Sequence, residues 1–162
     1  MNRSSADKDY LEKAISLYSK SMIRAAYSIT SNLNESEDIV QEVFFKLFSK
    51  QPVFNDPNHE KAWLLRVTIN DAHNRMRQLK NTQLNESFTD STVYFPDDDQ
   101  RAVMAAVQSL DEKYRIVIHL HFYEGYTINE ISKLLDIPSS TVGTRLERAK
   151  SKLKTILEPE VF

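Results

Sequence analysis

The scarcity of helix-breaking residues is the feature that most restricts how this chain can fold. Its 162 residues include only two glycines and five prolines, and both residue types disfavour the interior of a helix. Elsewhere Leu, Ile, Lys, Glu and Ala dominate, and apolar side chains recur at the spacing of amphipathic helices. We therefore predict an all-α protein.

One long stretch interrupts the helical pattern and divides the chain. Residues 81–99, NTQLNESFTDSTVYFPDDD, combine Asn, Ser, Thr and Asp with a proline and three aspartates, which is the composition of a linker. Residues 81–100 carry five acidic side chains and no basic one. The sequence thus predicts two small helical domains, residues 1–80 and 100–162, joined by a flexible acidic linker over residues 81–99.

The apolar spacing also places individual helices within each half. Those of the first half are expected over residues 7–30, 34–50 and 58–80, and those of the second over residues 97–108, 111–123, 127–135 and 139–157. Asn34 and Glu37 have the spacing of an N-cap pair for the second of these helices. No internal repeat interrupts this order.

The last two predicted helices have the spacing of a helix-turn-helix. Thr127 and Glu130 are placed as a capping box that starts the first helix, and Ser139 is the expected N-cap of the second. The apolar stripes of the two helices are Ile128, Ile131, Leu134 and Leu135, then Val142, Leu146, Ala149 and Leu153. A DNA-binding motif and a plain αα-hairpin with a solvated basic face both fit this spacing.

Positive charge gathers on the last helix although the net charge of the chain is -2. Residues 139–157 carry five basic side chains against Glu147 alone. Arginine forks reach guanine edges or phosphates in a major groove, and hydroxyl groups contact either. The residues expected to contact the duplex are Ser140, Thr141, Thr144, Arg145, Arg148 and Lys150.

The third predicted helix has an apolar and a polar face. Its apolar stripe is Leu65, Ile69, Ala72, Met76 and Leu79, and the opposite face gathers Arg66, Asn70, His73, Asn74 and Arg77, with Trp63 among them. A tryptophan beside arginine and asparagine can stack on an unpaired base, whereas a tryptophan at a helix start commonly belongs to the core. The residues alone leave both interpretations open.

The second predicted helix carries a mixed stripe beside its apolar one. Asp38, Gln41, Glu42 and Phe45 recur at i, i+3, i+4 and i+7. An aromatic anchor among polar side chains can dock a partner helix. A solvated face with one stray aromatic side chain fits the spacing equally well.

Little in the sequence indicates catalysis, a cofactor or a membrane. The chain has no cysteine, which excludes disulfides and thiolate metal sites. His119, His121 and Glu124 form the one histidine-carboxylate cluster, and the i, i+2 spacing points the two rings apart on a helix. There is no glycine-rich phosphate loop, no signal-peptide core and no apolar run near the roughly 20 residues of a membrane span. We expect a cytoplasmic protein that is not an enzyme and takes no metal, cofactor or small-molecule ligand.

Three segments, taken together, resemble one protein family in both halves and in order. NESEDIVQEVFFKLF, AWLLRVTINDAHNRMR and SLDEKYRIVIHLHFYEGYTINEISKLLDIPSSTVGTRLERAKSKL are similar to bacterial sigma factors of the extracytoplasmic-function group. The resemblance implies a protein that binds core RNA polymerase, directs it to specific promoters and helps open the DNA. It also implies that the first domain reads the minus-ten element and the second reads the minus-thirty-five element.

The same resemblance implies roles for individual residues. Asp38, Gln41, Glu42 and Phe45 would dock on the clamp helices of the largest polymerase subunit. The residues expected at the single-stranded minus-ten element are Phe54, Trp63, Arg66, Asn70, Asn74 and Arg77. A membrane-linked anti-sigma protein is the expected regulator. Asn74 replaces the family's usual aspartate and Gly143 falls where the family usually has a lysine, so the promoter preference stays open.

A different function remains as an alternative. A stand-alone helix-turn-helix regulator with an N-terminal sensing domain would also carry the motif of residues 127–157. Such a regulator needs a strong duplex-binding surface and usually a dimer interface, and the sequence indicates neither.

Overall fold

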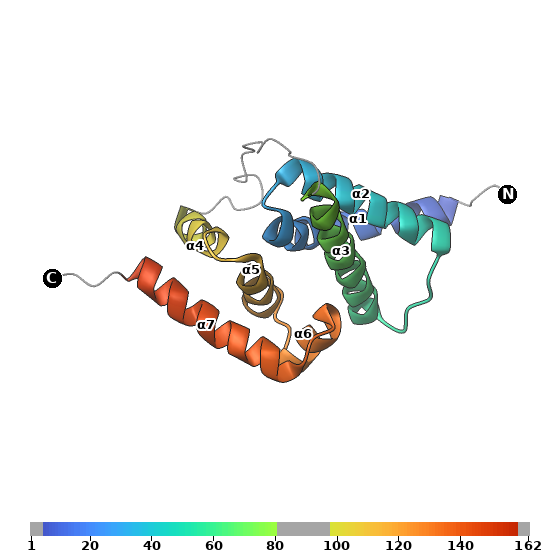
Figure 1. Ribbon diagram of the computed structural model, residues 1–162. Coiled ribbons are helices and arrows are strands. Elements are labelled where there is room, and N and C mark those ends of the chain that lie inside the picture. The colour runs from blue at the N-terminus through green and yellow to red at the C-terminus, as the bar shows by residue number, and fades with distance from the viewer. Residues whose placement is uncertain (1–4, 81–97, 159–162) are drawn as a thin grey trace. The chain divides into compact units, whose positions relative to one another are not determined.

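The computed structural model describes residues 5–80 and 98–158. The described residues contain helices and no strand, and the chain divides into two compact units, residues 1–86 and 87–162 (Figure 1). The prediction of an all-α fold with two small helical domains is confirmed. The predicted linker lies outside the described residues except for Asp98 and Asp99, the first residues of helix α4.

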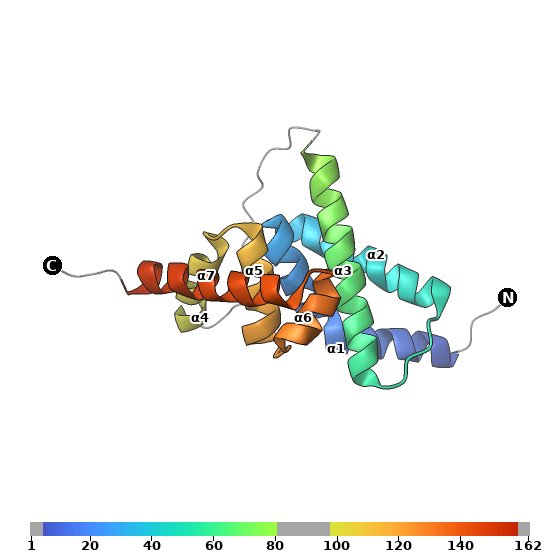
Figure 2. The ribbon, with the colours of Figure 1, turned by 60° about the horizontal axis from the view of Figure 1, so that its bottom comes forward.

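The first unit is built from three helices, α1 (Ser5–Thr30), α2 (Leu33–Lys50) and α3 (Pro57–Leu79). Helix α1 packs against both others, and α3 runs across α1 and α2 in both ribbon views (Figures 1 and 2). The core side chains of this unit include Met22, Ile29, Ile39, Val43, Leu47, Leu64, Leu65 and Ile69. The apolar stripes of the predicted helices therefore meet in one core.

The start of α2 differs from the prediction. Asn32, not Asn34, is the N-cap, and its side chain accepts a hydrogen bond from the backbone N–H of Glu35 at 3.0 Å. Both asparagines are followed by an acid three residues on, so the local pattern does not choose between them. The earlier start prevails because it brings Leu33 into the first turn of the helix, where it is buried in the core.

The predicted apolar stripe of α3 is only partly buried. Leu65, Ile69 and Ala72 are in the core, whereas Met76 and Leu79 are half-buried. The C-terminal end of α3 extends beyond α1 and α2 (Figure 2), so these last apolar side chains have fewer helices to pack against.

The second unit contains α4 (Asp98–Gln108), α5 (Glu112–Ile118), a π-helical segment η2 (His119–Tyr123), α6 (Ile128–Leu135) and α7 (Ser139–Leu157). Helix α7 packs against α4, α5 and α6. The core of this unit includes Ile116, Val117, Leu120, Ile131, Val142 and Leu146. In the described part of the chain, no helix combines the length and apolar character needed to cross a bilayer.

The end of the predicted helix 111–123 is widened into the π-helical segment η2. The N–H of Glu124 bonds the carbonyl of His119 at 3.1 Å, five residues back. The wider turn buries His119 and sets its Nε2 3.3 Å from Oε1 of Glu124, which is buried as well. His121 bonds the carbonyl of Tyr126 at 2.9 Å instead, so the two histidines have separate partners.

Candidate nucleic-acid interfaces

The helix-turn-helix of the second unit is fixed by local hydrogen bonds. The predicted capping box is confirmed: Thr127 N–H donates to Glu130 Oε1 at 3.0 Å, and Glu130 N–H donates to Thr127 Oγ1 at 3.2 Å. Asp136 ends α6 in the left-handed region, with φ of 55°. The Ser132 hydroxyl then bonds the carbonyl of Ile137 at 2.5 Å. The turn therefore sets a definite angle between α6 and α7.

The predicted N-cap of α7 is wrong. Pro138 occupies the cap position, and Ser139 is the first residue of the helix. The pyrrolidine ring fixes φ of Pro138 at -59°, and its ψ of 146° supplies the extended conformation that a cap requires. The hydroxyl of Ser139 is free to bond Oδ1 of Asn129 at 3.0 Å. This serine therefore ties the first turns of α6 and α7 together.

Helix α7 presents a row of polar side chains away from its core side. Val142, Leu146 and Ala149 are buried and Leu153 is half-buried. Of the candidate residues, Ser140, Thr144, Arg148 and Lys150 are exposed, and Thr141 and Arg145 are half-buried. Neither Arg145 nor Arg148 pairs with a carboxylate within the described residues. Both guanidinium groups are therefore available to phosphates or base edges.

Lys150 stands apart from the two arginines. It follows Arg145 by five residues, which places it about 140° away around the helix axis. Its Nζ lies 3.6 Å from Oε1 of Glu147 and 5.6 Å from the ring centre of Phe122. Lys150 therefore borders the exposed face of α7 on the edge opposite Arg145.

The candidate residues of α3 share one face. Arg66, Asn70, Asn74 and Arg77 are exposed, and Trp63 is half-buried on the same side. Arg77 donates a hydrogen bond to the side-chain oxygen of Asn74. This face lies opposite the buried Leu65, Ile69 and Ala72.

The loop before α3 is shaped by His59, which the sequence interpretation missed. Its Nδ1 accepts a hydrogen bond from the N–H of Asn55 at 3.1 Å, and its own N–H donates to the cap residue Asp56 at 2.8 Å. The ring of Phe54 packs edge-on at 5.3 Å from His59 and 5.8 Å from Trp63. The loop therefore holds Phe54 and Trp63 together next to the polar face of α3.

The start of α3 is braced against α1 by a pair of tyrosines. The Tyr10 hydroxyl donates a hydrogen bond to the Glu60 carboxylate. Burial, together with a hydrogen bond to Glu60, raises the pKa of Tyr18 to about 12. The same causes raise the pKa of Tyr10. Glu60 thus anchors the first turn of α3, directly after the loop that holds Phe54.

The mixed stripe of α2 is on the surface. Asp38, Gln41, Glu42 and Phe45 are all exposed, and 71% of the surface of Phe45 is accessible. Phe45 is therefore not part of the core, and the stripe is open to a partner.

Glu42 has a partner that the sequence did not predict. Its Oε1 lies 2.9 Å from Nη2 of Arg75, whose Nη1 lies 2.5 Å from Oε2 of Glu35. Burial alone would lower the pKa of Arg75, but the hydrogen bond to Glu35 and the charge of Glu42 outweigh it and raise the pKa. A second ion pair, Lys46 with Asp71 at 2.6 Å, also joins α2 to α3.

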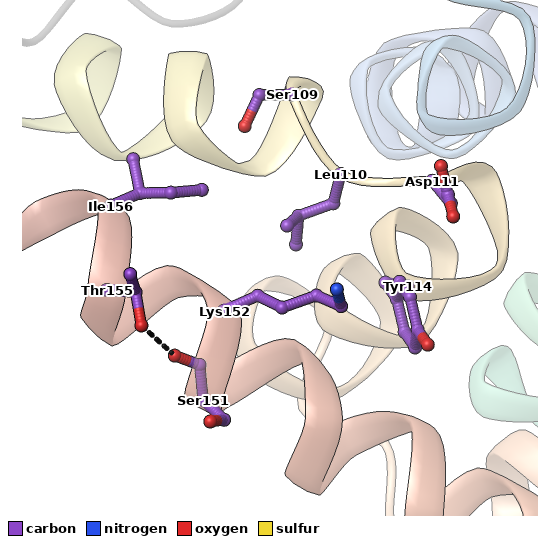
Figure 3. A pocket seen from close by; sticks show the side chains of 8 residues that line it. All are labelled: Ser109, Leu110, Asp111, Tyr114, Ser151, Lys152, Thr155 and Ile156. Carbon is purple, nitrogen blue, oxygen red and sulfur yellow. Dashed lines mark hydrogen bonds between the residues drawn. The ribbon is translucent and has the colours of Figure 1, made fainter.

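One pocket of the second unit lies between α7 and the segment that joins α4 to α5. It has a volume of about 380 Å³ and is lined by Ser109, Leu110, Asp111, Tyr114, Ser151, Lys152, Thr155 and Ile156 (Figure 3). The hydroxyls of Ser109 and Thr155 are bonded to backbone carbonyls, and Nζ of Lys152 lies 5.7 Å from the ring centre of Tyr114. None of the lining residues belongs to the candidate interfaces.

Comparison with known families matches both units. Residues 14–82 match the family described as Sigma-70 region 2, and residues 100–153 match that described as Sigma-70, region 4. The chain belongs to the sigma-70 family of transcription initiation factors, which direct RNA polymerase to promoters. Within that family it is a sigma factor of the extracytoplasmic-function group. The match of the first unit to region 2 disfavours a stand-alone regulator with a sensing domain.

Two individual relatives are similar to this chain over nearly its whole length. The ECF RNA polymerase sigma factor SigW of Bacillus subtilis is 25% identical, over 91% of this chain and 89% of the relative. The RNA polymerase sigma factor SigV of the same organism is 26% identical, over 99% and 98%.

Two solved structures share the fold. The sigma factor RpoE from Bartonella quintana, in complex with the anti-sigma factor NepR, has a TM-score of 0.76 and 22% identity, over 95% of this chain and 99% of that one. CnrH, in complex with the cytosolic domain of CnrY, has a TM-score of 0.64 and 22% identity, over 95% and 91%.

Proposed function

We propose that the two units divide the work of a cytoplasmic sigma factor that has no chemistry of its own. The first domain, residues 1–80, docks on core polymerase and engages the opened minus-ten element. The second, residues 100–162, reads the duplex at the minus-thirty-five element. The observation that carries this division is that α2, α3 and α7 each bury an apolar stripe and leave most of their candidate residues exposed, with Trp63, Thr141 and Arg145 half-buried.

Helix α7 would enter the major groove with its N-terminal half. Its first turns carry Ser140, Thr141 and Thr144, and the unpaired Arg145 and Arg148 follow. Arginine reads guanine through a bidentate contact and also binds phosphate, while hydroxyl groups contact either. The hydrogen bond of Ser139 to Asn129 and the capping box hold α6 and α7 in one geometry, which limits the entropy lost on binding.

Helix α3 and the loop before it would hold single-stranded DNA. Trp63 and Phe54 offer aromatic faces on which bases can stack, next to the amide and guanidinium groups of Asn70 and Arg66. The bonds that His59 makes to Asn55 and Asp56 fix the loop before DNA arrives. Such preorganisation reduces the cost of ordering the loop when a base binds.

Helix α2 would provide the contact with polymerase. Phe45 is a large apolar side chain that is mostly exposed in the free protein, and it is surrounded by Asp38, Gln41 and Glu42. An aromatic anchor within a polar rim is the usual composition of a binding hot spot. The ion pair between Arg75 and Glu42 keeps the Glu42 side chain in a defined position on this surface.

An anti-sigma protein linked to the membrane would regulate the chain by covering these faces. Support comes from the two solved structures that share its fold, since one holds a sigma factor bound to an anti-sigma factor and the other holds CnrH bound to the cytosolic domain of CnrY. A partner of this kind would compete with polymerase for Phe45 and with DNA for α7.

The docking surface is tested with Phe45→Ala, with Leu17→Ala as the matched control. Leu17 is an apolar side chain of the same unit, 60% exposed and on α1. Phe45→Ala should weaken binding to purified core polymerase at least tenfold, as truncation of a hot-spot residue typically does, while helicity by circular dichroism stays unchanged. Equal core affinities of the two variants would move the docking surface elsewhere.

The duplex surface is tested with Arg145→Ala and Arg148→Ala, and Lys152→Ala serves as the basic control on the same helix. Each arginine variant should weaken promoter binding by the holoenzyme by about 1 to 3 kcal/mol, with core affinity unchanged. Lys152 lies over Tyr114, so its variant should behave like the wild type. Normal transcription by both arginine variants from a promoter that needs its upstream element contradicts the assignment.

A further inference from the structure

Gly143 lies inside α7, and no contact among the residues that the structure describes requires a glycine there. Its φ is not in the left-handed region, and a Cβ placed on it meets no atom within 4 Å. Alanine would therefore fit and would stabilise the helix, because glycine loses more backbone freedom on folding. The packing of the second unit does not explain the missing side chain.

A hollow adjoins Gly143 on the surface of α7. It has a volume of about 590 Å³, and its lining residues are His121, Ile128, Ser140, Gly143, Thr144, Leu146, Glu147, Arg148 and Lys150. Four of them, Ser140, Thr144, Arg148 and Lys150, are candidate contacts to duplex DNA. The hollow therefore lies on the part of the surface that the proposed function assigns to the promoter.

The lining combines apolar surface with positive charge. Ile128 keeps 38% of its surface exposed, whereas Leu146 is buried and reaches the hollow with only 3% of its surface. The backbone of Gly143, which carries no side chain, completes the apolar part of the lining. Arg148 and Lys150 supply the positive charge, and Glu147 is paired with Lys150. Such a lining suits an apolar group that is carried by a polyanion.

DNA offers one apolar group of this kind in the major groove. Among the edges of the four base pairs, only thymine presents a methyl group, on C5, and the other groups there are hydrogen-bond donors and acceptors. Because glycine has no Cβ, a methyl group of the DNA can approach the helix backbone more closely at a glycine than at any other residue.

We propose that Gly143 is a specificity-determining residue, and that the hollow beside it receives the C5 methyl group of a thymine in the upstream promoter element. The inference rests on the proposed function, in which α7 enters the major groove. Arg148 and Lys150 contact phosphates on either side of the hollow. Glycine lowers the stability of the helix, and the contact that forms when the protein binds DNA offsets this loss.

The test removes a methyl group from the DNA and, separately, adds one to the protein at residue 143. The preferred upstream element is first selected from randomised duplexes with the holoenzyme, and each thymine is then replaced in turn by deoxyuridine, which lacks only the methyl group. With the wild type, one replacement should lower affinity about fourfold, the factor expected for one buried methyl group. With Gly143→Ala the preference should reverse at that position, because the alanine methyl group then stands where the thymine methyl group approaches the backbone.

Two controls keep the result interpretable. Gly143→Ala should raise the urea midpoint of the second unit, which shows that a loss on thymine is not a loss of fold. Ser151→Ala changes an exposed residue of α7 that does not line the hollow, and it should leave the preference for thymine over deoxyuridine unchanged.

Several outcomes overturn the inference. It fails if no thymine is selected, if no single replacement affects the wild type, or if Gly143→Ala weakens binding to both bases equally. A change in the binding of a protein partner, with the base preference unaltered, also overturns it. If the wild-type holoenzyme uses a scrambled upstream element as well as the selected one, the proposed role of α7 fails, not only that of Gly143.

Discussion

Replacing Arg75 by glutamine should cost the first unit about 2 kcal/mol of stability. The Arg75 side chain is 21% exposed and that of Glu35 is 25% exposed, whereas that of Glu42 is 57% exposed. A charge-assisted hydrogen bond in a partly buried site contributes about 1.5 kcal/mol or more, and an exposed ion pair contributes about 0.5 kcal/mol. The larger part of the loss therefore comes from leaving the Glu35 carboxylate without its partner.

The chain offers a selective probe for this measurement. Trp63 is its only tryptophan and lies on α3, so tryptophan fluorescence during a urea titration reports on the first unit. A loss of about 2 kcal/mol lowers Tm by roughly 8 to 16 °C in a domain of this size. The matched control is Lys46→Gln, which breaks the other ion pair between α2 and α3. Lys46 pairs with one carboxylate, whereas Arg75 pairs with two. The Lys46 side chain is 39% exposed and that of Asp71 is 17% exposed, so Lys46→Gln should cost about 1 kcal/mol, less than Arg75→Gln.

A double variant shows whether the lost stability comes from the carboxylate that is left without a partner or from the loss of the ion pair itself. In Arg75→Gln combined with Glu35→Gln, the half-buried Glu35 carboxylate is removed together with its partner, so part of the lost stability should return. The reasoning is refuted if Arg75→Gln costs no more than Lys46→Gln, or if the second substitution lowers stability further.

Two further predictions concern the tyrosine pair and the helix caps. Because Tyr10 and Tyr18 have raised pKa values in the folded state, their contribution to stability is complete below about pH 10 and is lost as the pH rises toward 12. The urea midpoint from Trp63 fluorescence should fall over that range, less so in Tyr18→Phe; equal pH profiles would contradict this. Thr127→Ala removes a helix cap and should cost the second unit about 1 kcal/mol of stability, whereas Ser139→Ala should cost less than about 0.5 kcal/mol. Hydrogen exchange of the α6 amides measures both losses. Equal losses would contradict the assignment of Thr127 as the cap.

Helices and their exposed faces could be predicted from the sequence because both depend on local spacing. The capping box at Thr127 was predictable, since both of its hydrogen bonds join residues three apart. The predicted caps at Asn34 and Ser139 were wrong for different reasons. At α2, both Asn32 and Asn34 fit the cap pattern, and the burial of Leu33 made the choice. At α7, Pro138 does not fit the pattern, and its fixed φ nevertheless places it at the cap position.

Contacts between helices could not be predicted in the same way. Arg75 lies 40 residues from Glu35, Tyr10 lies 50 from Glu60, and Lys46 lies 25 from Asp71. Which polar residues meet depends on where and at what angle the helices cross, and apolar periodicity does not specify that. The environment of Glu42 was therefore missed although its exposure was predicted.

The charge of α7 limits what the free protein can do on DNA. Five basic side chains lie on this helix, one of them is paired with Glu147, and the chain as a whole carries a net charge of -2. Affinity for duplex DNA grows with the number of phosphates neutralised, so the protein alone should bind promoter DNA with a Kd near 10⁻⁴ to 10⁻⁶ M at physiological salt.

Docking of the first unit on polymerase holds the second at an effective concentration that reaches roughly the millimolar range, so weak groove contacts suffice. Labelled promoter DNA titrated with the protein, with core polymerase and with both should show tight, sequence-specific binding only for the mixture, whereas tight specific binding by the protein alone would show that α7 needs no tether.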